Sequence, residues 1–145
     1  MIRIICLGKI KEEYLKQGID DYFKRISKYH KIEIVELKDD NDIDKESTQI
    51  LKYLNSAQLN IAMDIQGTKI SSVDLSKIID QSFNNYASIN FIIGSSNGLS
   101  NEVKALCQKR ISFGNITMPH GLFRLVLLEQ IYRGFKINNN ESYHK

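Results

Sequence analysis

The sequence has little of what would assign it to several common classes of protein. It contains no tryptophan, one proline and only two cysteines, Cys6 and Cys107, whose spacing fits neither a metal site nor a redox motif. Both cysteines lie in apolar patterns, so we expect small buried side chains in a reducing compartment. No apolar stretch approaches the roughly 20 residues of a membrane span. The apolar run between Arg3 and Lys9 is too short for a secretion signal. We therefore expect a cytoplasmic protein without membrane contacts.

Motifs of nucleotide and metal chemistry are also absent. Gly8 ends the first apolar run but is followed by KIKEEY, so there is no G-x-G-x-x-G dinucleotide fingerprint. The segment GSSNGLS (94–100) lacks the lysine of a phosphate-binding P-loop, and no nucleophile elbow occurs. His30, His120 and His144 are far apart and have no acidic partners at ligand spacing, so we expect no metal.

What the sequence does contain suits a single globular domain of 145 residues with 42% hydrophobic and 26% charged residues. The net charge is +3, a weak bias, but the charges are unevenly placed. Basic residues outnumber acidic ones in 1–38 (nine against six) and 110–145 (five against two), whereas 39–64 is acidic (two against six). This distribution fits either one surface that faces a polyanion or ordinary solvated faces.

Short apolar runs alternate with helical periodicity along the whole chain. The strands are expected at residues 2–7, 32–37, 59–65, 89–93 and within 111–118. Ser71, with Asp74 three residues later, and Ser100 are expected N-caps of the helices that follow them. Five strand–helix alternations predict one α/β domain, residues 1–145, with a mostly parallel sheet covered by helices on both faces.

Three loops that contain glycine or proline follow three consecutive strands. They are DIQG (64–67), GSSNG (94–98) and TMPHG (117–121). Each alone fits an ordinary turn. Ligands of open α/β sheets bind beyond the carboxyl ends of the strands, and these loops meet at that edge. Together they predict a cofactor site formed mainly by main-chain groups.

The last thirty residues are the least ordinary part of the chain. Residues 122–135 are apolar on nearly every side of a helix, yet include Arg124, Glu129 and Arg133. Such a helix is buried either in a large core or at a subunit interface, and the small size of the chain favours an interface. The tail after residue 138 has no periodicity, so spacing alone predicts a frayed terminus.

The chain resembles a known family at several quoted segments. They are LGKIKEEY (7–14), DIQG (64–67), IIGSSNGL (92–99), FGNITMPHGLFRLVLLEQIYRGFKI (113–137) and YHK (143–145). Together they resemble the ribosomal RNA large-subunit methyltransferase H family of small SPOUT-class methyltransferases, over essentially the whole chain. The resemblance implies a C-terminal trefoil knot, where periodicity alone predicts an unknotted sheet. It also implies a homodimer that uses S-adenosylmethionine to methylate N3 of a pseudouridine in a hairpin of large-subunit rRNA, within the assembled ribosome.

The resemblance also assigns residues to the site. Cofactor contacts fall on Met63, Gly94, Phe113, Gly114, Asn115, Ile116, Thr117 and Met118. These residues lie at the strand ends that the loops had already indicated. One departure is Ser95, where the family often has a second glycine; serine narrows the allowed backbone angles and adds a hydroxyl.

The expected catalytic residues are His144 and Tyr143 of the tail, with Arg124 as their electrostatic partner. In a dimer, the tail of one subunit would cover the cofactor of the other. The sequence does not decide which residue is the base, and His120 is either reactive or structural. Basic residues of the N-terminal third, Arg110 and Arg133 are expected to contact RNA phosphates.

Two alternatives remain open at this stage. One is a SPOUT methyltransferase that acts on tRNA, and the other is a non-catalytic module that binds RNA or a nucleotide. A module without activity would be expected to lose the tail or the strand-end glycines. Gly94, Gly98, Pro119 and the terminal Tyr-His pair are all present, which favours catalysis.

Overall fold

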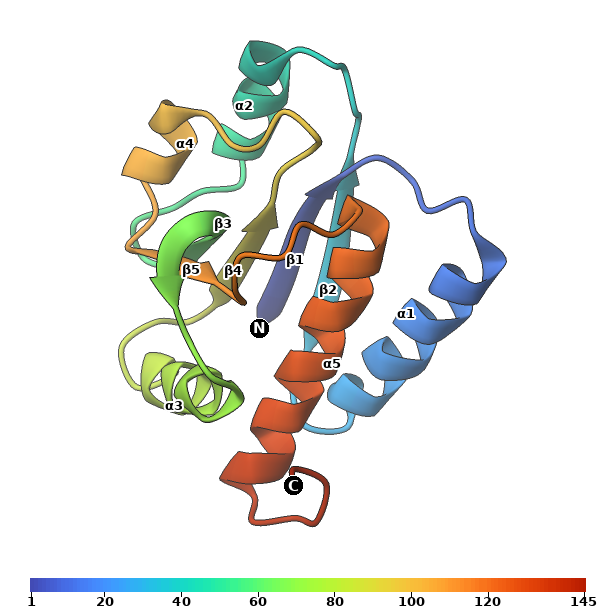
Figure 1. The fold of residues 1–145 in the computed structure, drawn as a ribbon. Coiled ribbons are helices and arrows are strands. Elements are labelled where there is room, and N and C mark those ends of the chain that lie inside the picture. The colour runs from blue at the N-terminus through green and yellow to red at the C-terminus, as the bar shows by residue number, and fades with distance from the viewer.

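Five parallel strands form the centre of the molecule in a computed structural model, which describes residues 1–145. The strands are β1 (Ile2–Leu7), β2 (Ile32–Leu37), β3 (Leu59–Lys69), β4 (Ile89–Ile93) and β5 (Lys109–Ser112). They lie in the order β2-β1-β4-β3-β5 (Figure 1). The bounds expected for the first, second and fourth strands are confirmed, because their apolar runs end where the buried strands end.

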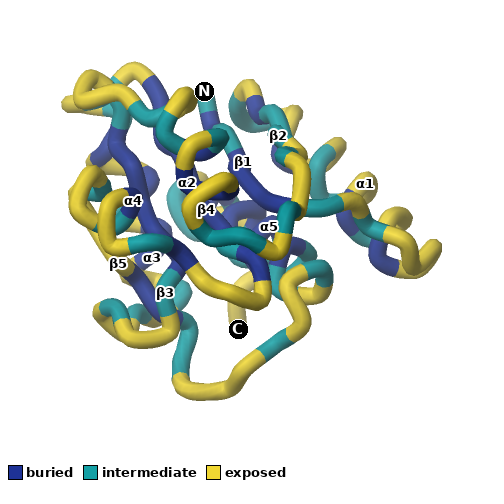
Figure 2. Tube along the Cα trace, turned by 90° about the horizontal axis from the view of Figure 1, so that it is seen from above, coloured by how far each residue is buried: buried dark blue, intermediate teal, exposed yellow.

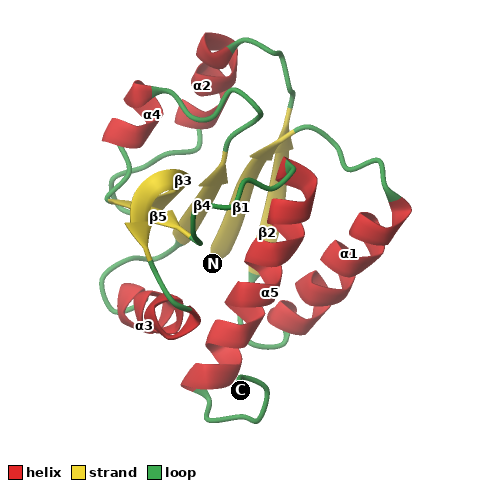
Figure 3. Ribbon diagram, in the orientation of Figure 1, coloured by secondary structure: helices red, strands yellow, loops and turns green.

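Helices cover both faces of the sheet, as the alternating pattern predicts (Figure 3). The helices are α1 (Glu13–Ser27), α2 (Ile43–Leu51), α3 (Ser72–Ser82), α4 (Asn101–Ala105) and α5 (His120–Asn138). Helices α1, α3 and α5 pack on one face, where Ile4 and Phe91 belong to the larger core. Helices α2 and α4 pack on the other face, over Ile5 and Ile92. Figure 2 shows the buried strands enclosed by exposed loops and helix faces.

Two predicted helix caps are present in the structure. The Ser71 hydroxyl accepts a hydrogen bond from Asp74 N at 3.0 Å, and the Asp74 side chain accepts one from Ser71 N at 2.9 Å, which completes a capping box. The Ser100 hydroxyl accepts from Val103 N at 3.2 Å. Local side-chain chemistry therefore sets where α3 and α4 begin.

The structure corrects the expected bounds of the third and fifth strands. β3 continues through Gly67 to Lys69, and β5 begins at Lys109 instead of within 111–118. The pairing of the two strands shifts register between Met63 and Thr68, so β3 bends and pairs with β5 twice. At Gly67 a Cβ atom would lie 2.7 Å from the Arg110 carbonyl, so glycine here permits close strand approach instead of ending the strand.

Residues 113–118 form a loop that leads from β5 into α5. α5 runs down one face of the sheet between α1 and α3, and the chain then turns back at its lower end (Figure 1). The trefoil knot that the family resemblance implies stays a prediction. No helix combines the length and the apolar character that a membrane crossing requires.

Candidate active site

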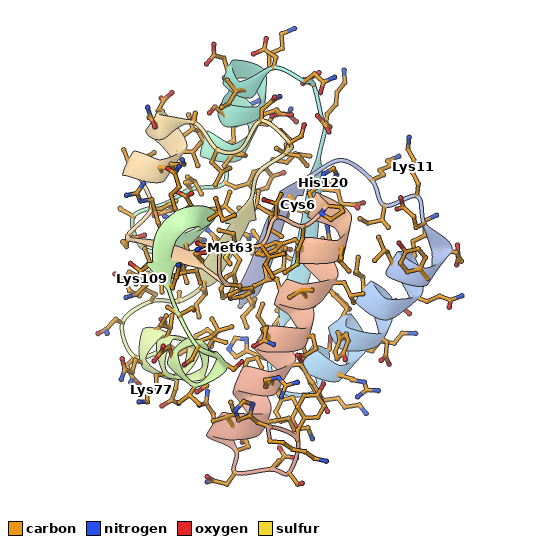
Figure 4. The ribbon with its side chains drawn as sticks, viewed as in Figure 1. Cys6, Lys11, Met63, Lys77, Lys109 and His120 are labelled. Atoms are coloured by element: carbon orange, nitrogen blue, oxygen red, sulfur yellow. The ribbon has the colours of Figure 1, made fainter.

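A cavity of about 630 Å³ lies where the middle of β3, residues 63–65, meets the loops after β4 and β5. Small-molecule sites usually occupy such clefts at the carboxyl ends of parallel strands. Seven of the eight residues expected to contact the cofactor line it: Met63, Gly94, Phe113, Gly114, Ile116, Thr117 and Met118. Asn115 is exposed and does not line it. Figure 4 labels two lining residues, Met63 of β3 and His120 at the start of α5.

Two glycines shape the loop after β4. A Cβ atom at Gly94 would lie 2.7 Å from the carbonyl of Gly98, so any side chain there would displace the loop. Gly98 has a φ of +75°, and its N–H donates to the Ser95 carbonyl at 2.9 Å. The resulting tight turn exposes main-chain groups to the cavity without side chains in front of them.

Ser95 uses its additional hydroxyl to fasten this loop to α2. The hydroxyl donates to Glu46 Oε1 at 2.7 Å and accepts from Asn97 N at 3.2 Å. A second bond between the two segments joins the hydroxyls of Ser47 and Ser100. The loop that borders the cavity is therefore held from behind by a helix on the opposite face of the sheet.

Glu46 is an acid buried among polar partners. Burial raises the pKa of its carboxyl, the nearby Asp39 carboxyl raises it further, and the hydrogen bond from Ser95 opposes the shift. Glu46 Oε2 also accepts from Asp40 N at 3.3 Å. The carboxyl thus connects the loops after β2 and β4.

The C-terminal tail is ordered, so the expectation of a frayed terminus is wrong. The Tyr143 ring packs edge-on against Tyr132 with centroids 4.9 Å apart, and the Arg133 guanidinium lies 4.8 Å from its centre. The Tyr143 hydroxyl donates to Glu129 at 3.5 Å. Burial is the largest cause of a strongly raised pKa at Tyr143, so its phenol stays protonated near neutral pH.

His144 is oriented by Arg133. Arg133 Nη1 lies 3.1 Å from His144 Nδ1, and because a guanidinium can only donate, Nδ1 is the acceptor. A neutral His144 ring then carries its proton on Nε2. The exposed tail therefore presents an N–H donor to its surroundings.

The tail and the cavity of one chain lie at opposite ends of α5. Pro119, His120 and Phe123 at its start line the cavity, whereas Tyr143 packs on its last turns. The helix has 19 residues, which corresponds to about 28 Å at roughly 1.5 Å per residue. The structure therefore does not bring His144 and Tyr143 to the cofactor residues of their own chain.

Arg124 is not near the tail either. Its side chain is only 2% exposed, and its guanidinium donates to Glu36 Oε2 at 2.6 Å and to the Gly8 carbonyl at 3.0 Å. These contacts join α5 to the carboxyl ends of β1 and β2. The expectation that Arg124 stands beside Tyr143 and His144 is not met within one chain, because its hydrogen bonds hold it beneath the start of α5.

Asp64 and Lys104 are cavity residues that sequence reasoning did not single out. Asp64 was named only as part of the DIQG segment (64–67) expected at the cofactor site, and Lys104 falls within the short α4, whose pattern indicated core packing. Their oxygen and nitrogen lie 3.4 Å apart. The position of Asp64 directly after an apolar strand is the signal that could have found it.

Comparison with known proteins agrees with this architecture. A family model described as "Predicted SPOUT methyltransferase" matches residues 1–144. The protein named Ribosomal RNA large subunit methyltransferase H from Caldicellulosiruptor bescii is 43% identical to this chain, and the alignment covers all of both chains. Proteins of the same name from Fusobacterium nucleatum and Clostridioides difficile are 45% and 46% identical to this chain, and each alignment covers 99% of both chains.

A solved structure supports the fold alone. A probable methylase family protein from Haemophilus influenzae shares 14% identity with a TM-score of 0.56, over 99% of this chain and 70% of that one. The full-length relatives confirm the resemblance inferred from the motifs. The chain belongs to the SPOUT methyltransferases and, within them, to the ribosomal RNA large subunit methyltransferase H family.

Proposed function

We propose that this chain, as a homodimer, transfers a methyl group from S-adenosylmethionine to N3 of a pseudouridine in a large-subunit rRNA hairpin of the assembled ribosome. The observation that carries the proposal is the convergence of seven expected cofactor residues in one cavity. Family membership supports the reaction class and the type of RNA.

The cavity fits the cofactor. Its volume suits a ligand of this size, and Ile93, Leu99 and Ile111 provide apolar walls for a flat ring. The glycine turn at 94–98 leaves main-chain groups free to bond it. S-adenosylmethionine supplies a methyl group already activated by a sulfonium. The protein's contribution is to hold donor and acceptor in line and to exclude water.

The tail is proposed to act on the partner's cavity. Tyr143 and His144 contact Glu129 and Arg133, which lie about 14–20 Å along α5 from its start at the cavity, so the tail cannot serve its own chain without rearrangement. The transfer forms the N3–methyl bond, breaks the sulfonium–methyl bond to leave S-adenosylhomocysteine, and releases the N3 proton to solvent. The carbonyl oxygens beside N3 gain negative charge as that proton leaves. The His144 Nε2–H, held by Arg133, is suited to donate a hydrogen bond to that charge. Tyr143, whose phenol stays protonated, positions His144 and does not serve as a base.

Exposed apolar side chains near the cavity support a dimer. Ile116 is 80% exposed, and Ile65 and Leu122 are 47% and 38% exposed. Ile65 and Ile116 line the cavity, and Leu122 precedes the lining residue Phe123. A partner that covers these side chains would also close the cavity, so the site would be completed only on assembly.

Arg124 is proposed to position the start of α5. Its bonds to Glu36 and Gly8 fix the helix end that carries Pro119 and His120. For RNA contacts, the exposed Lys9, Lys11 and Lys16 before and within α1 form no ion pair, and Lys11 is labelled in Figure 4. Arg133 and Arg110 each pair with an acid, but the Arg133 side chain is 23% exposed and the Arg110 side chain 51%, so Arg110 is the stronger candidate for a phosphate contact.

The experiment that tests this function compares substrates. Purified protein with labelled S-adenosylmethionine should methylate 70S ribosomes that lack the modification, and should leave tRNA unmodified. Methylation of tRNA alone would replace the proposed substrate. Cofactor binding without transfer to any RNA would favour a non-catalytic module.

A further inference from the structure

One part of the cavity is charged while the rest is neutral. Apart from His120, the only ionisable side chains that line it are Asp64 of β3 and Lys104 of α4. The remaining lining groups are apolar side chains, glycines and hydroxyls. A ligand that carries opposite charges at one end would place that end here.

Asp64 is a buried acceptor without a full set of donors. Its side chain is only 7% exposed. Oδ1 accepts from Gln66 N at 3.0 Å, but Oδ2 has no hydrogen-bond donor. Lys104 Nζ and Arg110 Nη1 lie 3.4 and 3.6 Å from Oδ2, close enough to pair with it electrostatically but not in hydrogen-bond geometry. A carboxylate oxygen withdrawn from water in this way calls for a donor from a ligand.

Lys104 has the complementary property. Its ammonium group has three N–H donors, and its one charged neighbour in the protein is Asp64. Arg110 contacts Asp64 but does not line the cavity, so it supports the carboxylate from behind. The cavity thus places the Asp64 carboxylate, which lacks a donor, directly beside the Lys104 ammonium group, which has unused N–H donors.

We propose that Asp64 and Lys104 bind the amino-acid end of S-adenosylmethionine, an inference that rests on the proposed function. The α-ammonium group of the ligand would donate to the Asp64 carboxylate, and the α-carboxylate would accept from Lys104. The adenosine part then occupies the apolar region next to Ile93 and Ile111. Because the two charges of the ligand lie on one carbon, a protein pair 3.4 Å apart matches their spacing.

The test is calorimetric binding with ligands that differ only at this end. S-adenosylhomocysteine carries the amino acid, and 5′-methylthioadenosine lacks it but keeps the ribose, the other source of donors for Asp64. Asp64→Asn should weaken S-adenosylhomocysteine roughly 10–100-fold and leave 5′-methylthioadenosine nearly unchanged. Lys104→Met should weaken S-adenosylmethionine but not its decarboxylated analogue, which lacks the α-carboxylate.

Glu102→Gln and Lys109→Met are matched controls, because both residues are exposed and lie outside the cavity. Each variant is compared with itself across ligands, so a general loss of stability does not affect the ratio. If Asp64→Asn fails to fold, the Lys104→Met comparison alone decides. Equal weakening of both ligands would overturn the inference and assign Asp64 to the ribose. Failure of the parent protein to bind S-adenosylmethionine would overturn the proposed function as well.

Discussion

Ser95 ties the conformation of the loop after β4 to a side chain of α2. A glycine at this position would remove one of the two bonds between the loop and α2, because the serine hydroxyl donates to Glu46 and also accepts from Asn97. Both groups are buried, so each relies on the other in place of water. The conformation of a cofactor loop is thereby coupled to a helix that never touches the cavity.

Removing this hydroxyl should be costly. Ser95→Ala leaves Glu46 Oε1 buried without its donor, which should lower the free energy of unfolding by about 1–3 kcal/mol and weaken cofactor binding. Urea unfolding and calorimetry measure the two effects. For the unfolding measurement, Ser96→Ala is the matched control, since Ser96 is an exposed neighbour in the same loop. A Ser95→Ala protein as stable as the control would show that the bond contributes nothing.

The buried Glu46 should also leave a signature in the pH dependence of stability. Its pKa is raised in the folded state, so between the unfolded and folded pKa values the folded protein binds more protons. Its contribution to stability is full below the ordinary pKa of glutamate and is lost as the pH rises through the raised value.

Glu46→Gln should abolish this loss, because the amide oxygen still accepts from Ser95 but does not titrate. The measurement is the difference in unfolding free energy between the parent and the variant at a series of pH values from about 4 upward. Glu102→Gln, which removes an exposed acid, should show no such trend. A flat difference for Glu46→Gln would mean that the carboxyl titrates normally.

At the scale of elements, α5 contributes to the core along one side and to the cavity at its start. Leu127, Leu128 and Ile131 are fully buried within the chain, so a charge at any of them tests folding and not assembly. Leu122 is the exposed apolar residue of this helix. It is therefore the position at which a dimer contact can be tested separately.

Leu122→Glu should convert the dimer to a folded monomer. Stable dimers commonly bury about 2,000 Å² or more, and a charge inside such a surface is not tolerated. Sedimentation at micromolar concentration reports the mass, and circular dichroism reports the fold. Leu106→Glu is the control, because Leu106 is 54% exposed beside α4, on the other face of the sheet. An unchanged dimer for Leu122→Glu would place the interface elsewhere.

Elements with one dominant local signal could be predicted from the sequence. Buried parallel strands such as β4 appear in the sequence as continuous apolar runs. The capping box of Ser71 and Asp74 marks the start of α3. β5 was misplaced because its first residues, Lys109 and Arg110, are exposed on an edge strand and carry no apolar pattern. Its pairing is set by the bend of β3 around Gly67, a long-range contact that no local pattern encodes.

The candidate site also has parts that the sequence predicts and parts that depend on long-range contacts. Loops at strand ends follow from topology, so the glycine turn and the segment 113–118 could be located. The ion pair of Asp64 with Lys104 and the bond from Ser95 to Glu46 join residues about 40 and 49 positions apart, and only the fold brings them together. The order of the tail likewise depends on the contact between the Tyr143 and Tyr22 hydroxyls and on the packing of Tyr143 against Tyr132 of α5.

For the molecule as a whole, the proposed homodimer makes activity a property of two chains, because cavity and tail of one chain lie apart. His144→Ala should lower turnover roughly 10²–10³-fold, the usual effect of losing one donor to a developing charge, with little change in cofactor affinity. Rapid-quench methylation measures the turnover, and calorimetry measures the cofactor affinity. A matched variant, Lys145→Ala, keeps the tail length and should retain activity.

A mixed dimer tests whether the tail acts across the interface. One subunit carries His144→Ala, and the other carries Gly94→Ala, which displaces the cofactor loop. If tails serve the partner's cavity, the intact tail reaches the intact cavity, and about half of the parent activity remains. If each tail serves its own cavity, the mixed dimer is inactive.

The packing of the tail against its own subunit determines at which stage the tail residues become ordered. Glu141 accepts hydrogen bonds from Tyr29 at 2.8 Å and Lys136 at 3.1 Å, and Tyr143 lies against Tyr132, all within one chain. Fixing a residue costs about 1–2 kcal/mol of backbone entropy. For these residues that cost falls on the folding of the subunit and not on the encounter with RNA. For the proposed role of the tail, capture of the substrate would then require no search for an ordered tail conformation, and its rate would depend on diffusion and on the charges of the two surfaces.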